Sequence, residues 1–146
     1  MDAVEEAVKL AKYHQVRVIL NPAPASHLPA RLLQEIDILT PNETEGKFIA
    51  TGQADSNVQL EEITSQILSK GVKNVVMTLG GRGVAFSEGE TVRFLKADTV
   101  KVVDTTGAGD TFNAGLAVYL TEGHTLEQAV CFGQKTAALS ITSFGA

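Results

Sequence analysis

The chain has 146 residues, 44% of them hydrophobic and 20% charged, so it is long enough to fold around one hydrophobic core. A formal net charge of −5 without a cluster of basic residues argues against nucleic acid or an acidic membrane as the main partner. The chain has one cysteine, no apolar run long enough to cross a bilayer, and an acidic start unlike a signal peptide. These features predict a cytoplasmic protein. Together with the net charge, they favour small molecules as its ligands.

Helix and strand patterns alternate through the first half of the chain. Because parallel strands need long crossover connections, this alternation predicts a parallel sheet with helices on its faces. The expected elements are, in chain order, a helix over residues 3–14, a strand over 16–20, a helix over 28–35, a strand over 37–40, a helix over 42–50, a helix around 60–68 and a strand over 74–79.

The second half of the chain begins with a different pattern. Residues 84–87 and 91–95, separated by the turn Glu88-Gly89-Glu90, predict a β-hairpin after the third strand. The β-rich run 100–103 predicts one more strand. The expected fold class is therefore α/β, an incomplete and mostly parallel sheet with flanking helices and one hairpin. Two helices are expected to end the chain, over residues 109–121 and 126–139.

Four loops follow the ends of predicted strands, and each contains polar or small residues. They begin at Asn21, Thr40, Thr78 and Asp104. In an open α/β sheet, ligands bind at the carboxyl ends of the strands. We therefore expect the chemistry of this chain to lie in these four loops.

The loop Asp104–Thr111 reads Asp-Thr-Thr-Gly-Ala-Gly-Asp-Thr and is predicted to join a strand to the start of a helix. Free N–H groups of the first helical turn would face an anion above Gly107–Gly109. A carboxylate repels a neighbouring phosphate unless it has another role, and accepting a proton from an attacking hydroxyl is such a role for Asp110. The alternative is that Asp110 or Thr111 only caps the helix.

Three other sequence features can be explained by local structure as well as by ligand binding. Asn42 followed three residues later by Glu45 fits a capping box, which needs no ligand, as well as a polar binding site. The glycines of Gly80–Gly83 would let a nucleotide approach the backbone, but they also suit a plain strand-to-hairpin turn. The side chain of Asp104 could also accept hydrogen bonds from backbone groups of its own turn, which needs no ligand.

In these four loops the sequence resembles the ribokinase-like carbohydrate kinases. The last loop matches the strongest signature of that superfamily, and the first two look most like the ribokinase branch. The resemblance extends over essentially the whole chain. The motifs occur in the family's order and at its approximate spacing, as Asn21-Pro22-Ala23-Pro24-Ala25, Thr40-Pro41-Asn42-Glu43-Thr44-Glu45, Thr78-Leu79-Gly80-Gly81-Arg82-Gly83 and Asp104 to Asp110.

The resemblance implies ATP-dependent phosphorylation of a sugar hydroxyl, with ribose converted to ribose 5-phosphate as the favoured reaction. It implies that Asp110 is the general base. It also implies that the backbone N–H groups of Gly107, Ala108 and Gly109 form the anion hole for the transferring phosphoryl group. The residues implied to bind the nucleotide are Asn42, Glu45, Thr78, Gly80, Gly81, Arg82, Gly83 and Gln134.

Two metal ions belong to the implied site. Glu45 would act on Mg²⁺ through water, beside the nucleotide phosphates. A potassium ion would stabilise the backbone around Gly107. The residues implied to hold potassium are Asp104, Thr106, Ser140, Ser143 and Gly145.

Kinases of this family are about twice as long as this chain. The resemblance therefore implies that residues 1–146 are the C-terminal, nucleotide-binding part of such a domain, and that the sugar-binding and lid portion is absent. We expect an unpaired strand edge at residues 16–20, self-association or pairing with the missing half, and no activity in the isolated chain. The alternatives are a non-catalytic nucleotide-binding or assembly remnant of a truncated kinase, and a kinase for fructose, a nucleoside or another sugar.

Overall fold

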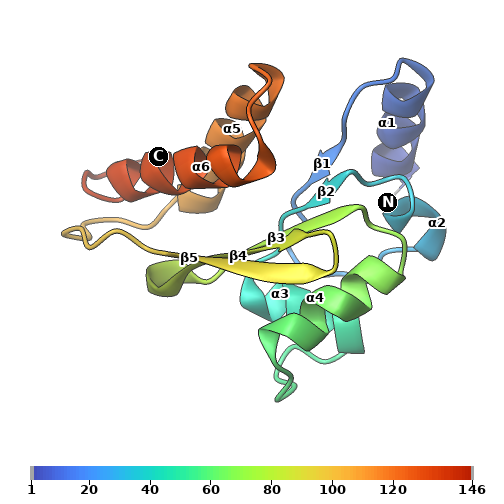
Figure 1. The fold of residues 1–146 in the computed structure, drawn as a ribbon, viewed down its shortest axis with the longest axis horizontal. Helices are drawn as coiled ribbons and strands as arrows, with labels where there is room; N and C mark the ends of the chain where they lie inside the picture. Colours follow the sequence, from blue (N-terminus) through green and yellow to red (C-terminus); the bar gives the residue numbers. More distant parts are fainter. Residues whose placement is uncertain (1, 146) are drawn as a thin grey trace. The chain divides into compact units, whose positions relative to one another are not determined.

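A computed structural model describes residues 2–145 of the chain, and Figure 1 shows its fold. Helices and strands alternate in the first half, and two helices end the chain. The elements are α1 (Asp2–Tyr13), β1 (Ile19–Leu20), α2 (Ala30–Leu33), β2 (Ile38–Leu39), α3 (Glu43–Thr51), α4 (Leu60–Ser69), β3 (Asn74–Thr78), the 3-10 turn η1 (Gly80–Arg82), β4 (Gly83–Glu88), β5 (Thr91–Lys96), α5 (Ala108–Thr121) and α6 (Leu126–Ser140).

The strands form one sheet in the order β1-β2-β3-β4-β5 (Figure 1). β1 pairs in parallel with β2, where Ile19 lies opposite Ile38, and β2 pairs in parallel with β3, where Ile38 lies opposite Asn74. β4 and β5 follow as a hairpin that turns at Gly89. The predicted α/β class, with a mostly parallel sheet and a hairpin after its third strand, is confirmed.

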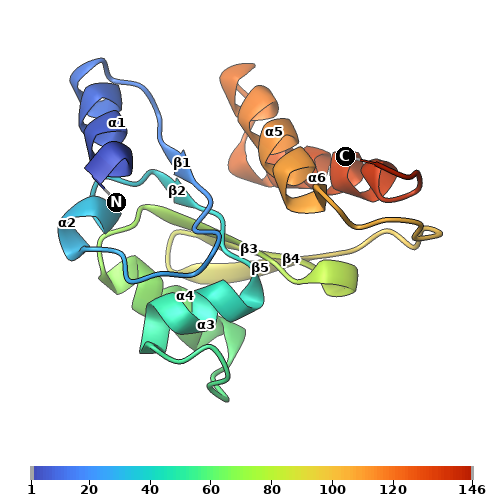
Figure 2. The same ribbon diagram turned by 180° about the vertical axis from the view of Figure 1, so that it is seen from behind.

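The described chain divides into two compact units. The first contains the residues up to Met77 together with Ala85–Arg93, and the second contains Thr78–Val84 together with the residues from Phe94 onward. In the first unit, α3 and α4 lie side by side against one face of the sheet (Figures 1 and 2). The core of this unit consists of fully buried apolar side chains, among them Leu33, Ile36, Leu39, Ile63, Ile67, Val75 and Val76.

In the second unit, α5 and α6 pack against each other. Two glycines allow the helices to come close. A Cβ atom on Gly115 would lie 2.5 Å from Thr136 Oγ1, and one on Gly133 would lie 2.8 Å from the carbonyl oxygen of Phe112. Because no side chain separates the helices at these positions, the Phe112 ring is buried between them.

Asp37, directly before β2, connects three segments of the first unit. Its Oδ2 accepts hydrogen bonds from Lys12 Nζ at 2.7 Å and from the Val18 N–H at 2.8 Å, and its Oδ1 accepts one from Lys73 Nζ at 2.7 Å. Burial raises the pKa of Asp37, but the hydrogen bonds outweigh that effect and lower the pKa from 3.8 to about 2. The carboxylate therefore stabilises the contacts between α1 and the segments before β1 and β3.

Asp37→Asn should lower the free energy of unfolding at pH 7 by about 1 kcal/mol, because the two lysines lose their anionic partner while solvent screens part of the interaction. The pKa of Asp37 is depressed in the folded state, so its contribution is present above pH 3.8 and is lost as the pH falls to about 2. Urea denaturation across this pH range measures the effect. Asp55→Asn, in an exposed loop, is the control. An Asp37→Asn effect that stayed constant with pH would contradict this account.

The predicted helices and the hairpin are confirmed, with their ends shifted by one or two residues. The strand expected over residues 16–20 is confirmed only for Ile19–Leu20. The strand expected over residues 100–103 is wrong, since the run is irregular and Val102 is 56% exposed. β-branched residues favour strands where neighbouring strands cover them, and no strand among residues 2–145 pairs with this run.

Candidate functional site

Helix α5 begins directly after Gly107, in the second unit. Gly107 has φ 72° and ψ 3°, a left-handed conformation that residues with a side chain rarely adopt. The N–H groups of Ala108 and Thr111 bond to carbonyls of the same loop, at 3.2 and 2.8 Å. For the N–H groups of Gly109 and Asp110, residues 2–145 provide no such partner. The first turn of α5 therefore presents free donors at the positive end of the helix dipole, as an anion requires.

Asp110 lies in this first turn, and its side chain does not cap the helix. The N-cap residue is Gly107, and no side chain makes a cap hydrogen bond there. The alternative that Asp110 or Thr111 serves as a cap is therefore wrong. Because Asp110 is exposed, its carboxylate is accessible in the same helical turn as the free N–H group of Gly109.

A tight turn, and not the expected strand, positions the start of this loop. Asp104 Oδ1 accepts the Thr106 N–H at 2.9 Å and the Thr106 hydroxyl at 2.7 Å, and Oδ2 accepts the Gly145 N–H at 3.3 Å. The backbone bond from Thr106, the side-chain bond from Thr106 and the bond from Gly145 lower the pKa of Asp104. The alternative in which Asp104 bonds its own turn is confirmed, and it places a negative charge next to the anion loop.

The segment after α6 lies against the same turn. The Ile141 carbonyl accepts the N–H groups of Val103 and Asp104, at 2.8 and 3.3 Å. Together with the bond from Gly145 to Asp104, these contacts join the two segments whose oxygens are expected around potassium. Those residues are Asp104, Thr106, Ser140, Ser143 and Gly145.

The turn η1 lies between β3 and β4, after the half-buried Thr78. A Cβ atom on Gly83 would clash with the carbonyl oxygen of Leu95, so glycine at this position serves the packing of the hairpin. In contrast, a Cβ atom on Gly80 or Gly81 would meet no atom within 4 Å. The outer side of the turn is therefore open for a ligand, while Gly83 has the structural role.

Two buried amide oxygens in the second unit have no hydrogen-bond partner in the described chain, Gln134 Oε1 and Asn113 Oδ1. Gln134 Nε2 donates to the Lys96 carbonyl at 2.7 Å and so ties α6 to the end of β5. Asn113 lies three residues after Asp110, hence on the same face of α5, and we did not predict it from the sequence. The spacing of three residues from Asp110 was the sequence signal that could have identified Asn113. A buried acceptor without a donor is a place for a ligand group or water.

Asn42 and Glu45 lie in the first unit, at the start of α3. Asn42 Oδ1 accepts the Glu45 N–H at 2.9 Å, and Glu45 Oε2 accepts the Asn42 N–H at 2.8 Å. The capping box is therefore confirmed. Glu45 is only 8% exposed, and its Oε1 takes no part in the cap. Nearby, Asn21 Nδ2 donates to the Thr40 carbonyl at 2.8 Å and connects the loops after β1 and β2.

The candidate residues thus fall into two groups, each within one compact unit. The first unit contains Asn42 and Glu45, and the second contains every other candidate. The larger group combines a helix start with free N–H groups, an accessible carboxylate and a turn that is closed by hydrogen bonds to the Asp104 carboxylate. These features suit a protein that acts on a phosphate-bearing small molecule.

The family model described as pfkB family carbohydrate kinase matches residues 1–146. The chain belongs to this family, which confirms the family expected from the sequence. It is 41% identical to the ribokinase of Haemophilus influenzae over 146 residues, which are 100% of this chain and 48% of that protein.

Solved ribokinases have the same fold. The structure of Thermotoga maritima ribokinase matches with a TM-score of 0.88 and 38% identity, over 98% of this chain and 48% of that one. The structure of Arabidopsis thaliana ribokinase complexed with ribose and ATP matches with a TM-score of 0.88 and 35% identity, over 99% of this chain and 47% of that one. The chain thus spans about half the length of the relatives it matches. Within residues 2–145, no helix is both long and apolar enough to cross a bilayer.

Proposed function

We propose that this chain is the C-terminal, nucleotide-binding part of a cytoplasmic kinase that transfers the γ-phosphoryl group of ATP to ribose, giving ribose 5-phosphate. The observation that carries the proposal is that an exposed carboxylate, Asp110, and the free N–H group of Gly109 share the first turn of α5. Membership of a carbohydrate kinase family supports phosphoryl transfer to a sugar. Similarity to a ribokinase complexed with ribose and ATP supports these two substrates.

In the proposed reaction, Asp110 accepts the proton of the attacking sugar hydroxyl. The hydroxyl oxygen bonds to the γ-phosphorus while the bond from that phosphorus to the β,γ-bridging oxygen breaks, and ADP leaves. The N–H groups of Gly107, Ala108 and Gly109 face the charge on the transferring group, and those of Gly107 and Gly109 have no hydrogen-bond partner within residues 2–145. One preorganised donor of this kind contributes about 2.7–4 kcal/mol, and a positioned base contributes about 10²–10⁴-fold in rate.

The remaining part of the nucleotide would contact the second unit at two other places. The open outer side of Gly80 and Gly81, after Thr78 and beside Arg82, offers backbone to the phosphates or ribose of ATP. The unpartnered Gln134 Oε1 suits the amino group of adenine, which donates hydrogen bonds. The open space at Gly80 and Gly81 and the unpartnered Gln134 oxygen support these two proposed contacts.

Two cations are part of the proposal. Mg²⁺ binds oxygen ligands and keeps several waters, so the Glu45 carboxylate fits an outer position around a nucleotide-bound Mg²⁺. Potassium also prefers oxygen, and the turn that joins Asp104 to the segment after α6 gathers carboxylate and carbonyl oxygens. Each ion would supply positive charge beside the phosphates.

Glu45→Gln separates the role toward Mg²⁺ from the capping role. Glutamine caps helices in this protein, since Gln128 Oε1 accepts the Thr125 N–H at 3.0 Å at the start of α6. We therefore expect the thermal stability to stay near wild type, while the Mg²⁺ concentration for half-maximal rate in the complete kinase rises about 10–100-fold. An unchanged dependence of the rate on Mg²⁺ would leave Glu45 with the cap alone.

The proposed function is tested with a complete kinase that contains this segment, assayed with ATP and with ribose, fructose or adenosine. We expect the highest kcat/KM for ribose, and a lower rate when Na⁺ replaces K⁺. A higher kcat/KM for another acceptor would overturn ribose as the substrate, and no phosphorylation of any acceptor would favour a nucleotide-binding remnant. Residues 1–146 alone should bind ADP weakly in isothermal titration and show no turnover.

A further inference from the structure

The loop that begins at Asn21 has no role in the proposed function, although it follows a strand as the other three loops do. Asn21 directly follows β1, and its Nδ2 donates to the Thr40 carbonyl, after β2, at 2.8 Å. Thr40 is 1% exposed, and its N–H donates to the Leu20 carbonyl at 2.9 Å. The Asn21 side chain therefore joins the carboxyl ends of two strands, at the edge of the sheet where α/β proteins bind ligands.

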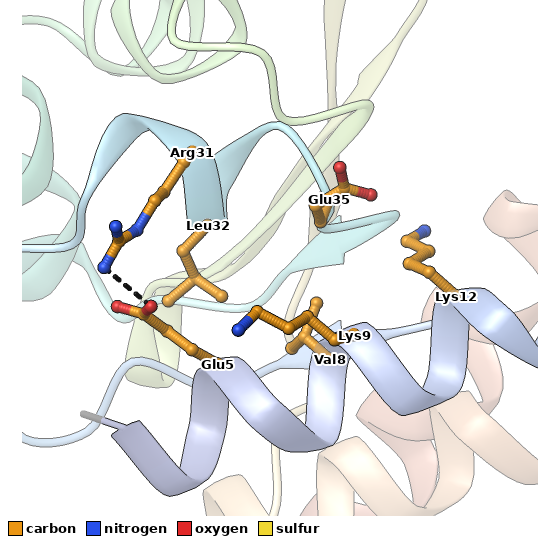
Figure 3. A pocket seen from close by; sticks show the side chains of 7 residues that line it. All are labelled: Glu5, Val8, Lys9, Lys12, Arg31, Leu32 and Glu35. Atoms are coloured by element: carbon orange, nitrogen blue, oxygen red, sulfur yellow. Dashed lines mark hydrogen bonds and ion pairs between the residues drawn. The ribbon is translucent and has the colours of Figure 1, made fainter.

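Other contacts hold the opposite ends of the same two strands. Asp37, directly before β2, accepts hydrogen bonds from the Val18 N–H at 2.8 Å and from Lys12 Nζ at 2.7 Å. Lys12 also lines a hollow of about 450 Å³ between α1 and α2, where Arg31 Nη2 donates to Glu5 Oε2 at 2.8 Å (Figure 3). These ion pairs keep α1 and both strands together, so the pairing of β1 with β2 is supported independently of the bond at their carboxyl ends.

One residue, Pro41, separates the Thr40 carbonyl from the Asn42 N–H. Pro41 is buried, and its ring fixes φ at about −65°. Because peptide groups are planar, only the ψ angle of Pro41 is left to vary between the two groups. The Asn42 N–H donates to Glu45 Oε2 at 2.8 Å. The Asn21 amide thus orients, by way of one rigid residue, the donor that holds the Glu45 carboxylate.

We propose that Asn21 is a positioning residue for the Glu45 carboxylate. Its amide holds the Thr40 carbonyl, and this fixes the Asn42 N–H that bonds to Oε2, while Oε1 takes no part in the cap. The positioning follows from these bonds alone. Its consequence for catalysis rests on the proposed function, in which Glu45 acts on Mg²⁺ through water. A bond that only joined the two strands would affect the stability and leave the dependence on Mg²⁺ unchanged.

Asn74 provides a matched control in the same compact unit. Asn74 Nδ2 donates to the Asp37 carbonyl at 3.1 Å, so it joins β3 to the segment before β2 by the same type of bond. Asn21→Ala and Asn74→Ala each remove one neutral hydrogen bond and should lower the Tm of the complete kinase by similar amounts. Asn21→Asp keeps the shape of the side chain but has no N–H donor, so it should behave like Asn21→Ala.

Two measurements on the complete kinase test the proposal. Hydrogen exchange at the Asn42 amide should be roughly three- to tenfold faster in Asn21→Ala and unchanged in Asn74→Ala, because one neutral hydrogen bond supports that amide. The Mg²⁺ concentration for half-maximal rate should rise by a similar factor in Asn21→Ala and stay constant in Asn74→Ala. In a Glu45→Gln background, Asn21→Ala should cause no further rise, because its effect passes through the carboxylate.

Unchanged exchange at the Asn42 amide in Asn21→Ala would overturn the proposal. Equal acceleration in Asn74→Ala would also overturn it, since the unit would then loosen as a whole. If Glu45→Gln shifts the Mg²⁺ dependence, Asn21→Ala must shift it too, and a shift that is equally large in the Glu45→Gln background would place the action of Asn21 elsewhere. Faster exchange at Asn42 without any Mg²⁺ effect of Glu45→Gln supports the positioning and counts against the proposed role of Glu45 instead.

Discussion

Asp110→Asn should nearly abolish sugar phosphorylation by the complete kinase while nucleotide binding stays close to wild type. The amide has the size of the carboxylate, but it does not accept the proton of the attacking hydroxyl. We expect kcat to fall by about 10²–10⁴-fold, the usual contribution of a positioned general base. The free N–H groups of α5 remain in place, so the affinity for ADP should change little. Steady-state kinetics and isothermal titration measure the two quantities.

Asp98→Asn is a matched control for this variant. Asp98 is an exposed carboxylate of the same compact unit and lies outside α5, so its replacement should leave kcat unchanged. Turnover of Asp110→Asn within a factor of a few of wild type would remove Asp110 from the role of base. A large loss of ADP affinity together with turnover would indicate that the variant damages the loop instead.

Gly133→Ala should destabilise the second unit by about 1–3 kcal/mol. The new Cβ atom would lie 2.8 Å from the Phe112 carbonyl oxygen and 3.2 Å from the Phe112 ring. The carbonyl belongs to the backbone of α5, so it does not move away without a shift of the helix. We therefore expect α5 and α6 to separate slightly, and thermal unfolding monitored by circular dichroism to show a lower Tm.

Gly81→Ala is the control for the glycine substitution itself. A Cβ atom on Gly81 would meet no atom within 4 Å, so this variant should unfold at nearly the wild-type temperature. The Tm of Gly115→Ala should lie between those of Gly133→Ala and Gly81→Ala. The closest contact of its new Cβ atom is the hydroxyl of Thr136, at 2.5 Å, and a side chain moves more easily than backbone. Wild-type stability of Gly133→Ala would show that the packing of α5 on α6 is looser than described.

Local sequence signals were sufficient for most helix boundaries. The Asn42 and Glu45 pair predicted the start of α3, and Gly52, with φ 80°, ends that helix in the left-handed conformation. The run 100–103 has the composition of a strand but lacks a neighbouring strand among the described residues, so it is irregular. Strand formation depends on partners that are distant in sequence, which a local pattern does not contain.

In the candidate site, too, local sequence patterns predicted some features, while others depend on the three-dimensional structure. The sequence placed Asp110 at a helix start, but the choice between cap and free carboxylate needed the backbone conformation of Gly107. The capping box of Glu45 was visible in the spacing, whereas the burial of its carboxylate to 8% was not. Asp37 was not predicted at all, because its lysine partners are 25 and 36 residues away along the chain.

The most direct test of the central claim is a crystal structure of the complete kinase with ribose and a non-hydrolysable ATP analogue. We expect an Asp110 carboxylate oxygen at about 2.6–3.2 Å from the ribose hydroxyl that faces the γ-phosphate. The γ-phosphate should contact the N–H groups at the start of α5. A nucleotide whose γ-phosphate lies away from that helix start, or an Asp110 beyond reach of the sugar, would contradict the account.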